Sequence, residues 1–196
     1  MQDNQHLIQR RNRLLQYFRF RLGIQQMFKN KPLLNILLIP IIVLFFVLWK
    51  EKEKAMYLFD VPEILFSAFH FSVSFMAIMI PLLLLLLILE TIGKLTARKD
   101  EVALLIAFEP KELRNGCPIL MSKKKLKGTS VMKSEYYSDI PLHKWEEKKN
   151  AIADAMNIRF VEEIQYGGRA NGKRIVIYTT SGRKAESREK LYDEEF

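Results

Sequence analysis

The sequence predicts a membrane protein, a two-helix transmembrane hairpin followed by a small cytoplasmic α+β domain. The first reason is a pair of apolar stretches, residues 33–49 and 64–89, that hold no Asp, Glu, Lys or Arg. The second is the contrast with the rest of the 196 residues, since 27% of the whole chain is charged and its net charge is +9. A single cysteine and three histidines exclude a disulfide framework and a Cys/His zinc module.

The N-terminal tail, residues 1–32, reads as a basic amphipathic helix next to the membrane. Its apolar residues recur four or seven positions apart at Leu7, Leu14, Phe18 and Leu22. Arginines surround this stripe: Arg10, Arg11, Arg13, Arg19 and Arg21. We expect an interfacial anchor held by anionic lipid headgroups, and the alternative is an arm that contacts a partner or DNA.

The two apolar stretches have the length of membrane spans. Residues 33–49 reach about 25 Å as a helix, near the lower limit for a bilayer. Residues 64–89 are longer and have no polar face, which a soluble helix of that length would show. Two polar residues interrupt them. Asn35 is expected to be able to hydrogen-bond to the other span, and His70 is expected near the membrane interface.

Charge sets the expected orientation. The tail 1–32 carries seven Lys and Arg and one acid, and Lys94, Arg98 and Lys99 follow the second span. The connection, residues 50–63, carries three Lys against four acids. By the positive-inside rule both termini are cytoplasmic, in a multi-pass protein of the cell membrane.

The cytoplasmic domain is expected over residues 94–182, followed by a charged tail, 183–196. A helix is predicted from Asp100, with acids at its positive end, with Val102, Leu105 and Ile106 facing inward and with Pro110 ending it. An extended piece at 118–121 and a strand at 131–137 follow.

The second half of this domain is predicted as β-α-β-β. The helix 141–156 begins at a cap, Asp139 or Ser138, and places Trp145 in the core. Two strands, 158–166 and 174–180, then pair across a Gly/Asn-rich turn.

Few residues suggest chemistry. The segment from Gly167 to Arg174 resembles a phosphate-binding loop, but Arg174 stands where a hydroxyl is required and a strand follows where a helix is needed, so we expect a hairpin turn. Cys117 has no base nearby in sequence. We therefore expect no enzyme activity, no cofactor and no metal. A lysine cluster is a candidate contact for phosphate or acidic lipid, with a solvated loop as the alternative: Lys123, Lys124, Lys125 and Lys127.

The order of these features resembles a known family region. A basic tail and two close spans precede a helix with Asp100, Glu101, Ala107 and Phe108. A second helix follows, with Trp145, Lys148, Asp154, Ala155, Met156, Asn157 and Ile158, and then the hairpin of residues 167–177. This is similar to the N-terminal membrane-anchor and adaptor region of FtsK/SpoIIIE-like DNA translocases, of the TcpA type found as coupling proteins on conjugative elements. Family members continue into an ATPase with Walker motifs, to which nothing in this sequence corresponds.

The resemblance implies a non-catalytic anchor or adaptor that docks a cytoplasmic DNA-translocation or conjugative-transfer ATPase at the membrane. It also implies oligomerisation through the spans, because such motors act as rings. The sequence then represents a detached anchor, a truncated product or the membrane half of a split system. The alternative function is a small two-span membrane sensor or regulator unrelated to DNA transfer. A pore-forming protein agrees less well with a cytoplasmic part of about half the chain.

Overall fold

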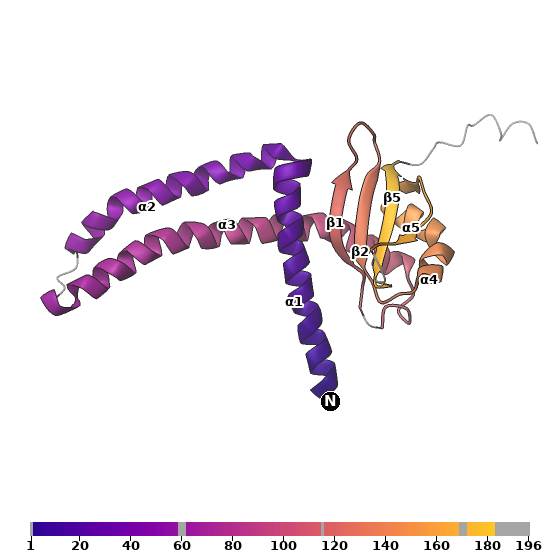
Figure 1. Cartoon of the computed structure of the whole chain (residues 1–196), viewed down its shortest axis with the longest axis horizontal. Coiled ribbons are helices and arrows are strands. Elements are labelled where there is room, and N and C mark those ends of the chain that lie inside the picture. Colours follow the sequence, from indigo (N-terminus) through magenta and orange to yellow (C-terminus); the bar gives the residue numbers. More distant parts are fainter. Residues whose placement is uncertain (1, 59–61, 115, 169–171, 183–196) are drawn as a thin grey trace, which may run out of the picture. The chain divides into compact units, whose positions relative to one another are not determined.

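The computed structural model describes residues 2–58, 62–114, 116–168 and 172–182. The chain divides into two compact units, Met1–Leu95 and Thr96–Phe196, each of which is described by itself. The first unit is helical and the second is built on an antiparallel sheet (Figure 1). Two apolar helices and a small antiparallel sheet domain are thus present, as the sequence predicts.

The first unit opens with helix α1 (Gln2–Gln25), whose last turn widens into the π-helical segment η1 (Gln26–Asn30). The backbone turns at Lys31, with φ −136° and ψ 74°, and Pro32 starts the 3-10 segment η2 (Pro32–Leu37). Helix α2 (Leu38–Leu58) follows directly. Proline is suited to the start of a helix because its missing N–H is not needed there.

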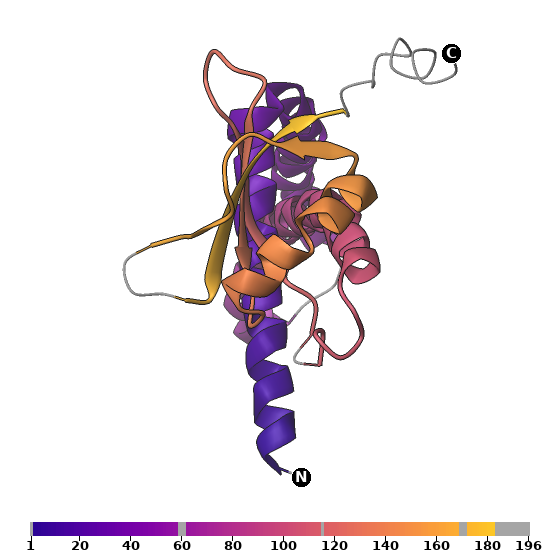
Figure 2. The same cartoon turned by 90° about the vertical axis from the view of Figure 1, so that its right-hand side faces the viewer.

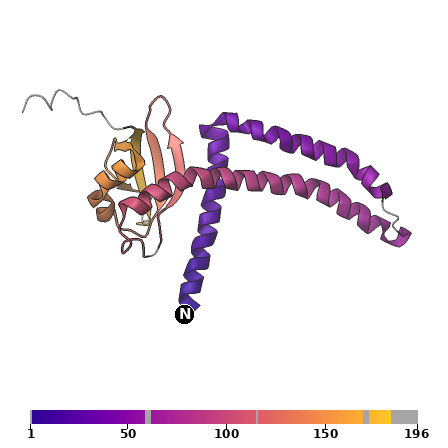
Figure 3. The same cartoon turned by 180° about the vertical axis from the view of Figure 1, so that it is seen from behind.

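Helix α2 extends beyond the first apolar stretch. It continues past Trp49 through the lysine-rich segment to Leu58, and α3 begins at Glu63, so the connection is shorter than the predicted 50–63. Local pairs support this extra helical length: Lys54 binds Glu51 at 2.8 Å, and the Lys52 ammonium lies 3.6 Å from the Trp49 ring centroid. Helices α2 and α3 run alongside each other (Figure 3).

Helix α3 (Glu63–Ala107) has 45 residues and ends in the second unit. The prediction of a separate helix that starts at Asp100 was wrong, because no strong helix breaker lies between the second apolar stretch and that residue. The helix ends before Pro110, which disfavours helical geometry for the residue that precedes it.

The buried face of this last part of α3 also differs from the prediction. Val102, Leu105 and Ile106, expected inward, are 48–74% exposed, whereas Leu104 is fully buried and Ala103 is 5% exposed. Apolar residues occupy both faces here, so periodicity alone could not choose between them.

Helices α1 and α3 cross in close contact within the first unit (Figure 1). A Cβ atom on Gly23 would lie 1.9 Å from the carbonyl oxygen of Leu89, and one on Gly93 would lie 1.8 Å from the carbonyl oxygen of Arg19. Both contacts are to backbone, so no side-chain movement can relieve them. The two backbones approach this closely because glycine has no Cβ atom.

The sheet of the second unit is antiparallel throughout. Its order is β1 (Ile119–Lys125), β2 (Met132–Tyr137), β5 (Arg174–Ser181) and β3 (Ile158–Phe160), and the short β4 (Gln165–Tyr166) also pairs with β5. The register between β1 and β2 shifts between Leu120 and Ser122. This irregularity interrupts the edge strand β1.

The strand predicted over residues 158–166 is two strands, β3 and β4, on the same edge of β5. Phe160 pairs with Thr179, and Gln165 pairs with Val176. The chain between Phe160 and Gln165 is therefore longer than the part of β5 that lies opposite it. The excess residues leave the ladder, and among them Ile164 is buried, at 3% exposed.

The helix predicted over residues 141–156 is two helices, α4 (Leu142–Glu147) and α5 (Lys149–Met156). They are separated at Lys148, which has φ −90° and ψ 9°. The predicted cap was also wrong, since Pro141 is the N-cap residue and no side chain caps the helix.

Ser138 has another role than the predicted cap. Its hydroxyl oxygen accepts hydrogen bonds from the Ile140 N–H at 3.0 Å and from the Trp145 indole N–H at 3.3 Å. Asp139, the other expected cap, instead pairs with Lys173 at 2.8 Å. Both side chains thus stabilise the segment that leads into α4, and neither caps the first turn of that helix.

The core of the second unit lies between its helices and one face of the sheet (Figure 2). The Trp145 side chain is fully buried, as predicted. Its ring packs edge-on against Phe108, at 5.1 Å between centroids, and in a tilted arrangement against Tyr136, at 5.5 Å. Ile152 and Ile175, from α5 and β5, are fully buried as well. An aromatic cluster of this kind joins α3, α4 and β2.

Candidate functional site

The two apolar helices present their side chains outward. The segments Pro32–Lys54 and Ile64–Ala107 are long and apolar enough to cross a membrane, a property that a soluble core helix can share. A soluble core helix is mostly buried, however, whereas only 6% and 17% of the most apolar windows of these two segments are buried. Large exposed side chains on α2 and α3 include Phe46, Val47, Leu65, Phe71, Met76 and Leu87.

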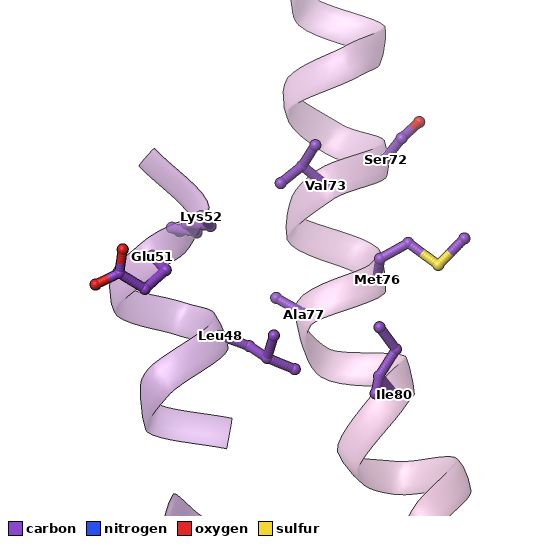
Figure 4. A pocket seen from close by; sticks show the side chains of 8 residues that line it. All are labelled: Leu48, Glu51, Lys52, Ser72, Val73, Met76, Ala77 and Ile80. Atoms are coloured by element: carbon purple, nitrogen blue, oxygen red, sulfur yellow. The ribbon is translucent and has the colours of Figure 1, made fainter. Parts of the chain in front are cut away.

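A groove lies between α2 and α3 within the first unit, with a volume of about 280 Å³. Leu48 of α2 points toward Ala77 and Ile80 of α3 in Figure 4. Lys52 lines the same groove near its polar end. The lining is otherwise mainly apolar, which fits contact with hydrocarbon rather than with a polar substrate.

Polar atoms inside the apolar helices stand out. The side-chain oxygen of Asn35 and the hydroxyl of Ser74 are buried and have no hydrogen-bond partner among the described residues. Asn35 therefore accepts no hydrogen bond from the other helix through this oxygen. His70 is exposed near the start of α3. By contrast, the Ser72 hydroxyl donates to the Ala68 carbonyl at 2.8 Å within α3.

The arginines of the tail lie on α1. Arg10, Arg13 and Arg21 are exposed, and Arg11 and Arg19 are half-buried. The apolar stripe between them is only partly available to lipid, because Phe18 is 6% exposed and Leu22 is fully buried. The side chain of Leu7 lies outside the described residues. The C-terminal half of the stripe thus packs on protein.

Lys123 belongs to a buried network rather than to a free lysine cluster. Its ammonium donates to both carboxylate oxygens of Asp100 at 2.8 Å, and the Tyr136 hydroxyl donates to the same carboxylate at 3.1 Å. Asp100 is 7% exposed and Tyr136 is fully buried. Burial, and next to it the Asp100 charge, raises the pKa of the Tyr136 phenol well above its usual value. The network joins α3, β1 and β2.

The three other lysines of the predicted cluster are exposed. Lys124 and Lys125 end β1, and Lys127 lies in the turn that leads to β2. The structure therefore separates one structural lysine from three that face solvent.

The segment that resembles a phosphate-binding loop is a hairpin at its described ends. The Gly167 N–H donates to the Arg174 carbonyl at 2.7 Å, and strand β5 begins at Arg174. Lys173 pairs with Asp139 at 2.8 Å, and Arg174 pairs with Glu135. Residues 169–171 lie outside the described residues. Both basic side chains are thus engaged by carboxylates.

Glu135 is the second buried carboxylate of this unit, at 8% exposed. Lys133 lies 3.1 Å from it, and the Arg174 guanidinium binds it directly. Burial raises the pKa of Glu135, but hydrogen bonds from Arg174 and Lys133 outweigh burial, so the pKa is lowered overall. For Lys133, burial lowers the pKa, and the bond to Glu135 outweighs it.

Cys117 is half-buried, and its thiol donates to the Glu101 carbonyl at 3.5 Å. Within the described ranges, no group of three or more His, Cys, Asp and Glu side chains is placed to hold a metal ion.

The sequence analysis did not predict that Asp100 and Glu135 are buried in ion pairs. It also did not predict that α1 and α3 cross at Gly23 and Gly93. The glycines do carry a signal, since a glycine inside a helical pattern often marks close backbone approach. The two carboxylates carry none, because their partners are distant in sequence.

No protein-family model and no curated protein matches the chain. Among solved structures, the chain is similar to the pCW3 conjugation coupling protein TcpA in its monomer form with ATPγS. The two are 25% identical, with a TM-score of 0.36, over 43% of this chain and 24% of that one. This chain thus spans about a quarter of that protein, and a TM-score of 0.36 is too low to establish a shared fold.

Proposed function

We propose that this protein is a non-catalytic membrane adaptor. Helices α2 and α3 cross the cell membrane with both termini in the cytoplasm, and the α+β unit docks a cytoplasmic ATPase of DNA translocation or conjugative transfer. The observation that carries the anchor is the outward exposure of two long apolar helices. Such surfaces are stable in hydrocarbon and unfavourable in water.

The adaptor part of the proposal rests on how the charged groups of the second unit are used. The buried Asp100 and Glu135 are bound to basic side chains within the unit, and the exposed Glu109 pairs with Lys148 at 2.9 Å. Groups held in this way stabilise a fold, and they are poorly placed for proton transfer or nucleophilic attack. The ATPase as partner comes from the order of sequence features that resembles the anchor region of FtsK/SpoIIIE-like translocases.

The test uses the full chain in its native membrane. After crosslinking, the chain is captured through an affinity tag and the captured proteins are identified by mass spectrometry. We expect the chain in the carbonate-resistant membrane fraction, together with a Walker-bearing ATPase. The matched control is a chain that ends at Leu95, which should reach the membrane but lose the ATPase. Recovery of the full chain in the carbonate-soluble fraction contradicts the anchor, and equal capture of the ATPase by both chains contradicts docking through the second unit.

The alternative, a two-span membrane sensor, has one observation in its favour. The buried side-chain oxygens of Asn35 and Ser74 lack partners among the described residues, and polar groups in a membrane find partners on neighbouring helices. Such partners fit either a second copy of the chain or a regulated contact. A crosslinked dimer that Asn35→Leu abolishes supports self-association. A cellular response to pH or lipid that persists without residues 96–196 and is lost in His70→Ala supports the sensor.

A further inference from the structure

The turn that connects β1 and β2 is preformed. The Leu126 N–H donates to the Val131 carbonyl at 2.9 Å, and the Thr129 N–H donates back to the Leu126 carbonyl at 3.3 Å. Gly128 supplies the positive φ of 74° that this turn requires. The residues 124–131, called the hairpin tip below, are thus held in one arrangement before any partner binds.

The lysines of the hairpin tip differ from most others in the same unit. Lys123 and Lys133, which flank the tip, each bind a buried carboxylate. Among the described residues, no ion pair involves Lys124, Lys125 or Lys127, and all three are exposed. Three positive charges are therefore gathered at the hairpin tip and exposed to solvent.

An apolar side chain lies among these charges. Leu126 is 38% exposed and stands between Lys125 and Lys127. Lysines alone would bind any polyanion, including the phosphates of a nucleic acid. An exposed leucine among them favours a surface that has phosphate groups outside and hydrocarbon beneath.

The chain keeps the second unit near such a surface. Seven peptide steps separate Leu89, the last residue of the second apolar stretch, from Thr96, the first residue of this unit. However the two units are arranged, this length holds those residues within about 25 Å of each other. A tether of that reach gives a high effective concentration of lipid headgroups.

We propose that the hairpin tip docks on anionic phospholipid headgroups of the leaflet that faces the α+β unit. Lys124, Lys125 and Lys127 contact the phosphates, and Leu126 enters the headgroup region. The contact rests on the proposed membrane anchor, and it gives the adaptor a second, charge-dependent attachment that fixes how the docking unit is presented to its partner.

The test measures contact of the tip with lipid in the full chain. Cys117→Ser removes the single cysteine, and Ser130→Cys then carries a fluorophore at the tip. The protein is reconstituted in nanodiscs of phosphatidylcholine, alone or mixed with phosphatidylglycerol, that contain a headgroup quencher. We expect strong quenching in the anionic discs, weak quenching in the neutral discs, and reversal by high salt.

Variants assign the contact to the tip. Changing Lys124, Lys125 and Lys127 to Gln should abolish most of the quenching, since each lysine changes the binding constant about fivefold. Leu126→Ser should lower the quenching that remains at high salt. The matched control changes three basic residues elsewhere in the unit to Gln, Lys111, Lys149 and Arg159, and should leave the quenching unchanged. The near-ultraviolet circular dichroism of the buried Trp145 checks that each variant is folded.

Each of the following results overturns the proposal. Equal quenching in neutral and anionic discs, or an equal loss in the control variant, removes the role of the tip lysines. A response of the tip fluorophore to duplex DNA but not to phosphatidylglycerol assigns the surface to nucleic acid. Failure of the chain to enter nanodiscs at all refutes the membrane anchor itself, whereas entry without quenching refutes only the docked tip.

Discussion

Replacing Asp100 by alanine should strongly destabilise the second unit while leaving the apolar helices folded. The carboxylate is 7% exposed and accepts hydrogen bonds from the Lys123 ammonium and the Tyr136 hydroxyl. Alanine removes both bonds and leaves the hydroxyl in a fully buried site. The change therefore acts through α3, β1 and β2 together.

The magnitude follows from these two partners. A hydrogen bond to a charged group contributes about 1.5–3 kcal/mol, and a buried donor without a partner costs about 1–3 kcal/mol. The Lys123 side chain is 27% exposed and can turn toward water, which lowers its share. We expect a loss of about 3–5 kcal/mol, out of a total stability of about 5–15 kcal/mol for a domain of this kind.

The assay uses the second of the two tryptophans as a local probe. In a Trp49→Phe background, Trp145 is the only tryptophan, and it packs against Tyr136 and Phe108. Urea unfolding of the full chain in nanodiscs, followed by Trp145 fluorescence, then reports on this unit. With a slope of about 2 kcal/mol per molar urea, the midpoint should fall by about 1.5–2.5 M.

A double-mutant cycle decides whether the ion pair is the cause. Asp100→Ala and Lys123→Ala, alone and together, should give a coupling energy of about 1.5–3 kcal/mol. Tyr136→Phe, which removes only the hydroxyl and its hydrogen bond to the charged carboxylate, should cost about 1.5–3 kcal/mol. A coupling below about 0.5 kcal/mol, typical of exposed pairs, would refute the assignment of a buried network.

Three further predictions concern other sites. Gly93→Ala places a Cβ atom 1.8 Å from the Arg19 carbonyl oxygen, so α1 should separate from α3 and be cut by trypsin about tenfold faster. In the control Gly172→Ala, the added Cβ atom meets nothing within 4 Å, so the rate of cleavage should not change. Glu135→Gln should weaken the unit at neutral pH. Because the folded pKa of Glu135 is lowered, its stabilisation is present above the unfolded value of about 4.3 and is lost as the pH falls through the folded value, so unfolding curves of the two proteins should converge in acid. Asn157, which ends α5 at φ 52° and ψ 52°, should accept glycine with little change in unfolding free energy, whereas alanine there should cost about 1 kcal/mol.

Local sequence patterns were sufficient to predict a structural element where the residues that determine it all lie within one segment. The uncharged stretches and the hairpin that is closed between Gly167 and Arg174 are of this kind. Local patterns failed where two alternative structures are consistent with the same pattern. Val102 and Leu104 are similarly apolar, and only the packing of the second unit decides that Leu104 is buried and Val102 is exposed. The break at Lys148 and the separation of β3 from β4 likewise follow from packing on the sheet, which no local pattern specifies.

The candidate site shows the same division. The basic character of residues 123–127 is evident from the sequence, but nothing local distinguishes one of these four lysines from another. The alternation of side chains along β1, together with the shift in register after Leu120, determines which of them meets Asp100.

By itself, therefore, the sequence determined that this protein has two apolar helices, a basic tail and a small mixed domain, because hydrophobicity and charge are properties of single residues summed over a segment. Only the tertiary structure decided which charged side chains form ion pairs within the fold and which remain exposed to a partner. It also revealed the backbone crossing at Gly23 and Gly93. Pairing and close approach depend on residues far apart in the chain, whose distances are fixed only once the helices and strands have packed.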